Sequence, residues 1–206
     1  MKINSIKFNF IMNLILTVSN FLFPLITFPY VSRVLLPEGT GKVAFAVSVI
    51  TYFSMLATFG VNSYGVRATA QVRDDKLLLS KVTHEILAIN FAVMCFVYML
   101  FFIALDVVPK LSTDPKLFII TSSMILFSII GVEWLYKGLE QYRYITVRTI
   151  IFRLIALAAT FLLVKEKSDY LVFAAITAFA TVGSGLVNFI NLRKIILLKF
   201  IGQYEF

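Results

Sequence analysis

The sequence predicts an all-α integral membrane protein with six transmembrane helices in a single lobe. Hydrophobic residues make up 60% of the 206 residues, and the mean hydropathy is +0.91. Soluble domains are only about half apolar. A transmembrane helix needs about 20 mostly apolar residues, and strand alternation typical of a β-barrel is absent. The expected spans are residues 8–31, 43–62, 86–108, 117–136, 149–164 and 171–192.

The first stretch follows Lys2 and Lys7 but is longer than the apolar core of a signal peptide, and no small-residue cleavage motif follows it. It is expected to remain as a membrane helix. Pro24 and Pro29 each remove a backbone donor, which leaves two interpretations, a gating bend and a static kink. Polar residues recur here at steps of three and four and therefore share one helix face: Asn9, Asn13, Thr17, Asn20, Pro24 and Thr27.

Residues 36–41, Leu-Pro-Glu-Gly-Thr-Gly, are expected to form a short turn before the second stretch. Similar polar faces follow in the second stretch, at Thr51, Ser54, Thr58 and Asn62, and in the sixth, at Thr177, Thr181, Ser184, Asn188 and Asn191. Such residues either hydrogen-bond between neighbouring helices or line half of a hydrophilic cavity for a hydroxyl-rich solute such as a sugar. The cavity interpretation is preferred. Its candidate residues are Asn13, Thr17, Asn20, Thr51, Thr58, Arg153, Thr177, Thr181 and Asn188.

The third stretch carries little polarity beyond Asn90 and is expected to face lipid. Residues 67–85, which precede it, are long enough for an amphipathic segment, and residues 109–115 resemble a turn. The single cysteine, Cys95, lies mid-span, so neither an internal disulfide nor a thiol-metal cluster is expected.

Two ionisable residues lie in or near the last spans. Glu133 shares one side of the fourth helix with Tyr136 and Glu140; it either couples transport to a proton or sodium ion or, as is favoured, pairs with a nearby Arg or Lys. Arg153 lies about five residues into the fifth stretch, on the stripe of Thr149. Its guanidinium either meets a phosphate through paired hydrogen bonds or extends to the membrane surface.

Basic residues indicate the orientation, because they concentrate in cytoplasmic segments. With the N-terminus inside, about two thirds of the 19 lysines and arginines fall on the cytoplasmic side, so both chain ends are expected there. The formal charge of +8 then reflects this bias and attraction to anionic lipid. No basic and aromatic platform lies outside the spans, so no nucleic-acid partner is expected.

No enzymatic chemistry is expected. His84 is isolated, no phosphate-cradling glycine loop is present, and the glycines at 183 and 185 lie inside a span, where close helix packing explains them. The sequence therefore predicts a non-enzymatic protein that needs no cofactor or metal ion.

Short motifs mark the ends of the apolar stretches along the whole chain. They are FPYVSRVL at 28–35, PEGTG at 37–41, YGVR at 64–67, VRDD at 72–75, EWLYKGLE at 133–140, VK at 164–165 and DY at 169–170. Together they resemble the polysaccharide-biosynthesis oligosaccharide flippases (Wzx type) of the multidrug/oligosaccharidyl-lipid/polysaccharide exporter superfamily. One departure is Leu36, where the family usually has Gly before Pro-Glu-Gly.

The resemblance implies movement of an oligosaccharide on undecaprenyl pyrophosphate across the bacterial cytoplasmic membrane, for capsule or O-antigen assembly. The polar lining would take sugar hydroxyls and Arg153 the pyrophosphate. Members of this family generally have two six-helix lobes, so the chain resembles an N-terminal lobe, to be completed by a second lobe of parallel orientation or by a homodimer. The alternatives are a cation-coupled drug exporter of the same superfamily and a truncated remnant that transports nothing.

Overall fold

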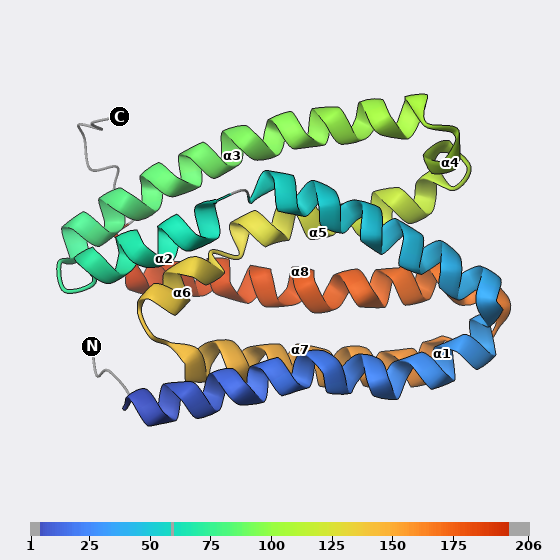
Figure 1. Ribbon diagram of the computed structural model, residues 1–206, viewed down its shortest axis with the longest axis horizontal. Coiled ribbons are helices and arrows are strands. Elements are labelled where there is room, and N and C mark those ends of the chain that lie inside the picture. The colour runs from blue at the N-terminus through green and yellow to red at the C-terminus, as the bar shows by residue number, and fades with distance from the viewer. Residues whose placement is uncertain (1–4, 59, 198–206) are drawn as a thin grey trace.

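The computed structural model describes residues 5–58 and 60–197, which form helices and no strand (Figure 1). Five helical segments are long and apolar enough to cross a membrane: α1, α3, Pro115–Gly138, α7 and Lys167–Ile195. The protein is therefore an all-α, multi-pass membrane protein, as the composition predicts. The helices are α1 (Ile6–Ala57), α2 (Val61–Val72), α3 (Lys76–Val107), α4 (Pro109–Ser112), α5 (Pro115–Ile130), α6 (Glu133–Gly138), α7 (Tyr142–Leu163) and α8 (Tyr170–Ile195), with a 3₁₀ turn at Lys167–Asp169.

Helix α1 contains both of the first two predicted stretches. Its backbone leaves the helical conformation at Leu36 (φ 58°, ψ 173°), next to Pro37, and the ribbon reverses direction there (Figure 1, blue). The turn predicted at residues 36–41 is thus compressed into one residue, while helical structure continues on both sides. We call residues 6–35 the first arm of α1 and residues 37–57 its second arm. This join explains why six predicted stretches correspond to five helical segments.

The region predicted as a loop at residues 67–85 is mostly helical. The second arm ends at Ala57, before the predicted boundary at 62, and Gly60 (φ 72°) precedes a separate helix, α2. Helix α3 then begins at Lys76, ten residues earlier than predicted, because the Asp75 carboxylate accepts hydrogen bonds from the backbone N–H groups of Leu77 (2.8 Å) and Leu78 (3.1 Å). Side-chain capping of this kind stabilises a helix start.

The fourth predicted stretch, residues 117–136, is broken in its last third. Helix α5 ends at Ile130, and Val132 adopts a left-handed conformation (φ 40°) before α6 begins at Glu133. Asn188 of α8 donates from Nδ2 to the carbonyl oxygen of Gly131 (2.6 Å) at this break. A neighbouring helix thereby satisfies a backbone group that the break would otherwise leave unpaired, which allows irregular backbone inside a membrane protein.

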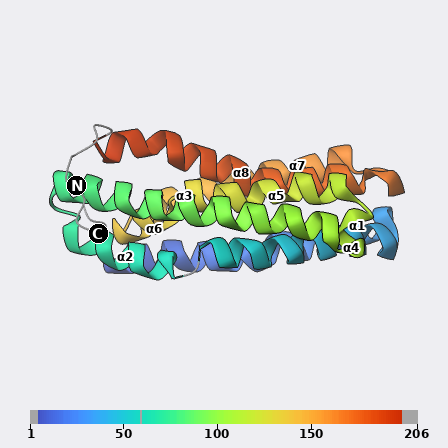
Figure 2. The same ribbon diagram turned by 90° about the horizontal axis from the view of Figure 1, so that it is seen from above.

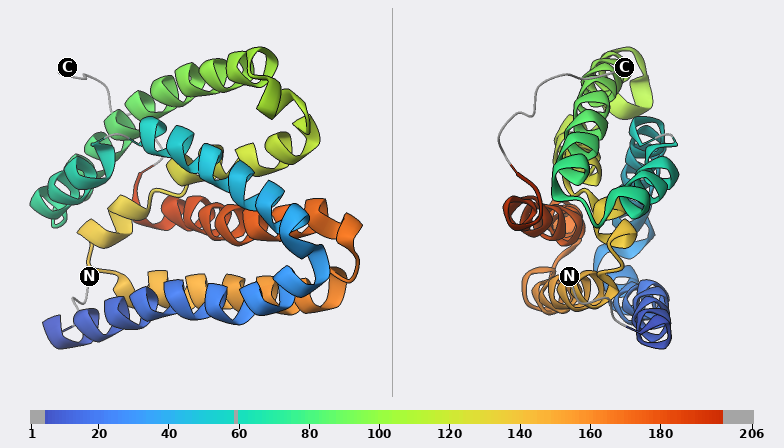
Figure 3. Two further views of the ribbon diagram at one scale, coloured as in Figure 1. Left: turned by 45° about the vertical axis from the view of Figure 1, so that its right-hand side comes forward. Right: turned by 90° about the vertical axis from the view of Figure 1, so that its left-hand side faces the viewer.

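The helices run along the long axis of one elongated bundle (Figure 2). The second arm packs with α3, α5 and α8 around Ile50, Phe101, Phe118 and Ile125, all essentially inaccessible to solvent. The first arm lies against α7 on the other side of α8 (Figure 3). It is the least covered segment, with only 11% of its most apolar window buried. The two arms of α1 therefore enclose space together with α7 and α8.

Candidate functional site

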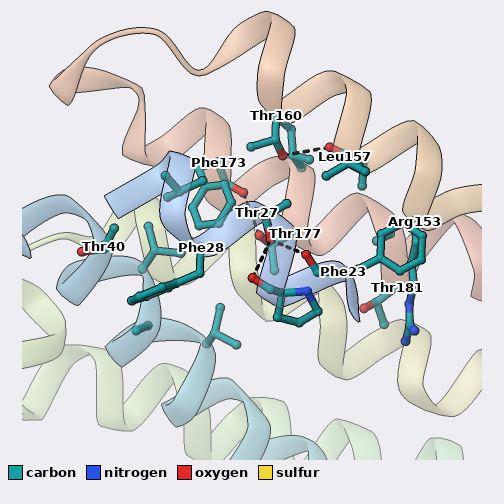
Figure 4. Close-up of a pocket in the computed structure, with 18 of the residues that line it drawn as sticks. Phe23, Thr27, Phe28, Thr40, Arg153, Leu157, Thr160, Phe173, Thr177 and Thr181 are labelled. Atoms are coloured by element: carbon teal, nitrogen blue, oxygen red, sulfur yellow. Dashed lines mark hydrogen bonds between the residues drawn. The ribbon is translucent and has the colours of Figure 1, made fainter. Parts of the chain in front are cut away.

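An open pocket of about 420 Å³ lies between both arms of α1, α7 and α8 (Figure 4). Five of the residues predicted from sequence line it: Asn20, Pro24, Arg153, Thr177 and Thr181. Its other described lining residues are mainly apolar or small. They are Phe23, Thr27, Phe28, Val31, Thr40, Val43, Ala44, Val47, Ala156, Leu157, Thr160, Phe173, Ile176 and Ala180.

Arg153 of α7 supplies the charge of this pocket. Its Nη1 donates to Ser19 Oγ (2.8 Å), its Nη2 donates to Asn20 Oδ1, and its guanidinium carbon lies 5.9 Å from the centre of the Phe23 ring. Among the described residues, no carboxylate forms an ion pair with it. Neutral oxygen atoms of the first arm thus orient a half-buried cation that is not paired directly with a carboxylate. A planar guanidinium in this situation is suited to a phosphate or carboxylate group.

Three threonines of the pocket bond to their own helices. The hydroxyls of Thr27, Thr160 and Thr177 donate to the carbonyl oxygens of Phe23 (2.8 Å), Ala156 (2.8 Å) and Phe173 (2.9 Å), each four residues earlier. These bonds lie within helices, so they do not link one helix to another. Because each hydroxyl proton is already used, the oxygen lone pairs are left to accept hydrogen bonds from a ligand. Sugar hydroxyl groups are donors of that kind.

Comparison with known proteins gives the family. The family model described as polysaccharide biosynthesis protein matches residues 6–204. The chain belongs to this family. Putative O-antigen transporters are similar to it: the protein of Escherichia coli strain K12 is 28% identical over 89% of the chain, and that of Shigella dysenteriae is 27% identical over 85%. The chain spans 44% of the length of each relative. No solved structure matches.

Other predicted residues of this polysaccharide biosynthesis protein lie outside the pocket. Asn13 and Thr17 are exposed on the first arm, one to two turns from Asn20 towards the N-terminus, and the Thr17 hydroxyl donates to the carbonyl oxygen of Asn13 (2.9 Å). Thr51 is exposed on the second arm, and Thr58 directly follows the last residue of that arm. Both hydroxyls bond to carbonyl oxygens four residues earlier, at 2.7 and 2.9 Å. The pocket thus occupies only part of the predicted stripes.

The seam that holds the first arm against α7 shares Asn9 with the predicted stripe, runs beside its other members, and was not recognised in the sequence. Asn9, Leu16 and Ser19 are its buried positions, and Thr146 of α7 donates to the carbonyl oxygen of Met12 (2.9 Å). Positions 9, 12, 16 and 19 follow steps of three and four, the spacing of a helix contact line. The polar stripe at 13, 17 and 20 lies one residue further round the helix, at the margin of the contact.

Asn188, Glu133 and Pro29 also lie away from the pocket. Asn188 is 1% exposed, and its side chain donates to the carbonyl oxygen of Gly131 at the break after α5. Glu133 pairs with Lys137 one turn later (2.9 Å), and its role in ion coupling stays a prediction. Pro24 lines the pocket whereas Pro29 does not, and the non-helical residue of α1 is Leu36. The gating role of the two prolines stays a prediction.

Arg148 is a second buried cation of this family member that sequence reasoning passed over as a surface charge. It is 6% exposed, donates only from Nη2, to Thr149 Oγ1 (3.2 Å), and lies 5.8 Å from the centre of the Tyr144 ring. Its Nε and Nη1 have no hydrogen-bond partner in the structure. The sequence signal was available in principle, because Arg148 directly precedes the fifth predicted stretch, within reach of the bundle interior.

Proposed function

We propose that this protein takes part in flipping a lipid-linked oligosaccharide repeat unit, carried on undecaprenyl pyrophosphate, across the bacterial cytoplasmic membrane for O-antigen or capsule synthesis. The observation that carries the proposal is the guanidinium of Arg153, which has no direct carboxylate partner, in a pocket otherwise lined by neutral residues. Membership of the polysaccharide biosynthesis family and similarity to proteins named putative O-antigen transporters support it.

The chemistry of the pocket fits the three parts of such a substrate. Arg153 would bind the pyrophosphate by charge-assisted hydrogen bonds, and the hydroxyl oxygens of Thr27 and Thr177 would accept from sugar hydroxyls. The prenyl chain would remain in the bilayer, since moving it into water is unfavourable by about 0.8 kcal/mol for each CH₂ group. The protein would thus bind only the pyrophosphate and the sugar, the polar groups that have to cross the apolar layer.

The same proposal assigns the chain to one half of the transport unit. If each arm of α1 crosses the membrane, the chain has six crossings and both ends lie in the cytoplasm. Asn13, Thr17 and Asn20 are exposed on the first arm, and polar groups are unfavourable against lipid unless they meet water or protein. A second six-helix lobe or a second copy would cover this face and complete the cavity.

The competing drug-exporter function has less support. An exporter of organic cations needs a carboxylate to compensate the charge of its substrate, yet no described lining residue of the pocket is acidic. Glu133 is the carboxylate that was considered for ion coupling, and it pairs with Lys137 outside the pocket. A truncated remnant that transports nothing is distinguished by the experiment below.

The test is glycan export in the host strain after deletion of the chromosomal gene. Reintroduction of the protein, together with a second lobe where the genome encodes one, is expected to restore surface polysaccharide. Arg153→Ala should reduce export at least tenfold at equal membrane abundance, since one charge-assisted bond is worth about 1.5–3 kcal/mol. Arg193→Ala is the matched control, because Arg193 is exposed at the end of α8. No restoration by the unaltered protein would contradict the function, and normal export by Arg153→Ala would contradict the site.

A further inference from the structure

A second open pocket, of about 390 Å³, lies between α2 and α6, at the end of the bundle where the described chain begins (Figure 1). Its described lining residues all come from these two short helices: Asn62, Ser63, Val66, Arg67, Trp134 and Lys137. None of them belongs to the pocket around Arg153. The position is near the predicted ends of the second and fourth membrane stretches, where a bundle meets the lipid headgroups.

Close packing through glycines fixes the walls of this pocket. A Cβ atom added to Gly65 of α2 would lie 2.6 Å from Cδ2 of Trp134, so the indole ring rests directly on the α2 backbone. A Cβ atom added to Gly138 of α6 would lie 2.5 Å from the Cβ of Thr69. The two helices therefore approach too closely for any side chain at these positions, and Trp134 is only 3% exposed.

Two basic side chains line the pocket, Arg67 and Lys137. The indole Nε1 of Trp134 is buried beside them without a hydrogen-bond partner. The exposed guanidinium of Arg67 forms no ion pair in the described part of the chain. Lys137 is paired with Glu133 at 2.9 Å, so the group retains one net positive charge. Asn62 and Ser63 stand in the first turn of α2, where the helix dipole is positive.

We propose that this pocket binds a phosphate group at the membrane surface. Arg67 and Lys137 would supply charge-assisted hydrogen bonds, and the indole ring of Trp134 would form the wall beside them. Arg and Lys side chains only donate, which matches a phosphate with several acceptor oxygens better than a ligand that also needs acceptors. Two sources carry this chemistry, the headgroup of an anionic phospholipid and a soluble phosphate or pyrophosphate. The proposal does not depend on the transport function.

Trp134 is the single tryptophan of the chain, so intrinsic tryptophan fluorescence reports on this pocket alone. The full chain in neutral detergent would be titrated separately with phosphatidylglycerol, phosphatidylcholine and inorganic pyrophosphate. A saturable change with phosphatidylglycerol and none with phosphatidylcholine or pyrophosphate is expected for a lipid headgroup. A saturable change with pyrophosphate identifies a soluble source. No saturable change with either anionic probe, or an equal change with phosphatidylcholine, overturns the proposal.

Substitutions test whether the named residues make the site. Arg67→Gln should weaken binding about fivefold, the usual effect of one basic residue near an anionic surface, and Arg67→Gln with Lys137→Gln should remove saturation. Arg67→Lys keeps the charge and should retain most of the affinity, which separates loss of binding from loss of folding. Lys116→Gln is the matched control, because Lys116 is exposed at the N-terminal end of α5. Unchanged affinity in the double variant would contradict the assignment.

Discussion

At the scale of single residues, Asn20 determines how Arg153 is presented. Its Oδ1 accepts from Arg153, it lines the pocket, and it is exposed on the first arm. Replacement by Leu keeps the approximate size and removes the acceptor. We expect Asn20→Leu to lower glycan export, by about threefold to tenfold, at unchanged abundance. Thr51→Val is the control, since Thr51 is exposed and bonded within its own helix. Equal effects of the two variants would contradict a specific role.

A separate prediction about Asn20 is that water reaches the pocket at this position. A cysteine at position 20, in a Cys95→Ser background, is expected to react with a water-soluble maleimide, because Asn20 is exposed beside a charged group. The measurement is the rate of labelling in intact membranes, compared with the native thiol of Cys95. Resistance to the reagent at position 20 would favour burial of the polar stripe between helices.

Asn188 illustrates a polar residue whose role is structural. Its side-chain Nδ2 donates to the backbone carbonyl oxygen of Gly131 (2.6 Å), and its backbone carbonyl oxygen accepts from the Tyr136 hydroxyl (2.7 Å). We expect Asn188→Ala to destabilise the protein by about 1–2 kcal/mol, measured by thermal unfolding in detergent. Asn191→Ala removes only a longer bond to Tyr136 (3.4 Å) and should cost less. A smaller effect for Asn188 than for Asn191 would contradict this account.

Helical spacing predicted some residues of the pocket and not others, for a physical reason. Asn20, Thr177 and Thr181 line the same pocket as Arg153, because their helical spacing places these polar residues on the helix faces that are turned towards it. Asn188 continues the same stripe as Thr177 and Thr181, yet its position is decided by the break after α5, which no periodic pattern in the apolar sequence reveals. Arg148 was missed because its burial depends on how α7 packs.

At the scale of elements, the reversal of α1 places a strained residue between the two arms. Leu36 adopts φ 58° and ψ 173°, a combination that only glycine adopts without strain, at about 1–3 kcal/mol for other residues. We expect Leu36→Gly to leave thermal stability unchanged or raise it by about 1 kcal/mol, because the side chain is 37% exposed. Leu35→Gly should be strongly destabilising, since Leu35 is 1% exposed. Equal losses in the two variants would contradict strain at Leu36.

The contact between α2 and α6 has its own test. Gly138→Ala would bring a methyl group within 2.5 Å of the Thr69 Cβ and 2.9 Å of the Val66 carbonyl oxygen. We expect a loss of about 1–3 kcal/mol in unfolding free energy, as for other overpacked sites. Gly41→Ala is the control, because a Cβ there meets nothing within 4 Å and Gly41 is helical. Comparable melting temperatures for both variants would show that the helices separate without strain.

Sequence patterns located the elements better than their ends. The starts of α3 and α7 were predicted too late, since their first turns carry the charged residues Lys76, Lys81, Arg143 and Arg148, which an apolar window excludes. The break at Gly131 and Val132 was missed because both sides are apolar and its hydrogen-bond partner comes from α8. Local composition therefore predicts the apolar segments and the turn at Leu36, whereas the break at Gly131 and Val132 depends on packing against α8.

At the scale of the whole molecule, the question is how many times the chain crosses the membrane. Five helical segments qualify by length and apolarity, but α1 reverses at Leu36 (Figure 1). Each arm, at about 1.5 Å per residue, is long enough for the roughly 30 Å apolar layer. Glu38 and Lys42, which pair at 2.7 Å and are solvent-exposed, lie at the reversal. Charged groups favour the membrane surface over its interior. Six crossings are therefore expected, with both termini on one side.

Topology reporters decide between six crossings and five. Alkaline phosphatase fused after residue 206 should be inactive and a fluorescent protein fused there should fluoresce, because the C-terminus is expected inside; an N-terminal fluorescent protein should also fluoresce. A phosphatase inserted at Gly41, beside the reversal of α1, should be active. If the reversal stays inside the membrane and α1 counts as one crossing, the two termini will report opposite sides. That outcome would exclude a second lobe in the same, parallel orientation. Termini on the same side of the membrane indicate an even number of crossings. The polar face of the first arm could then contact such a lobe.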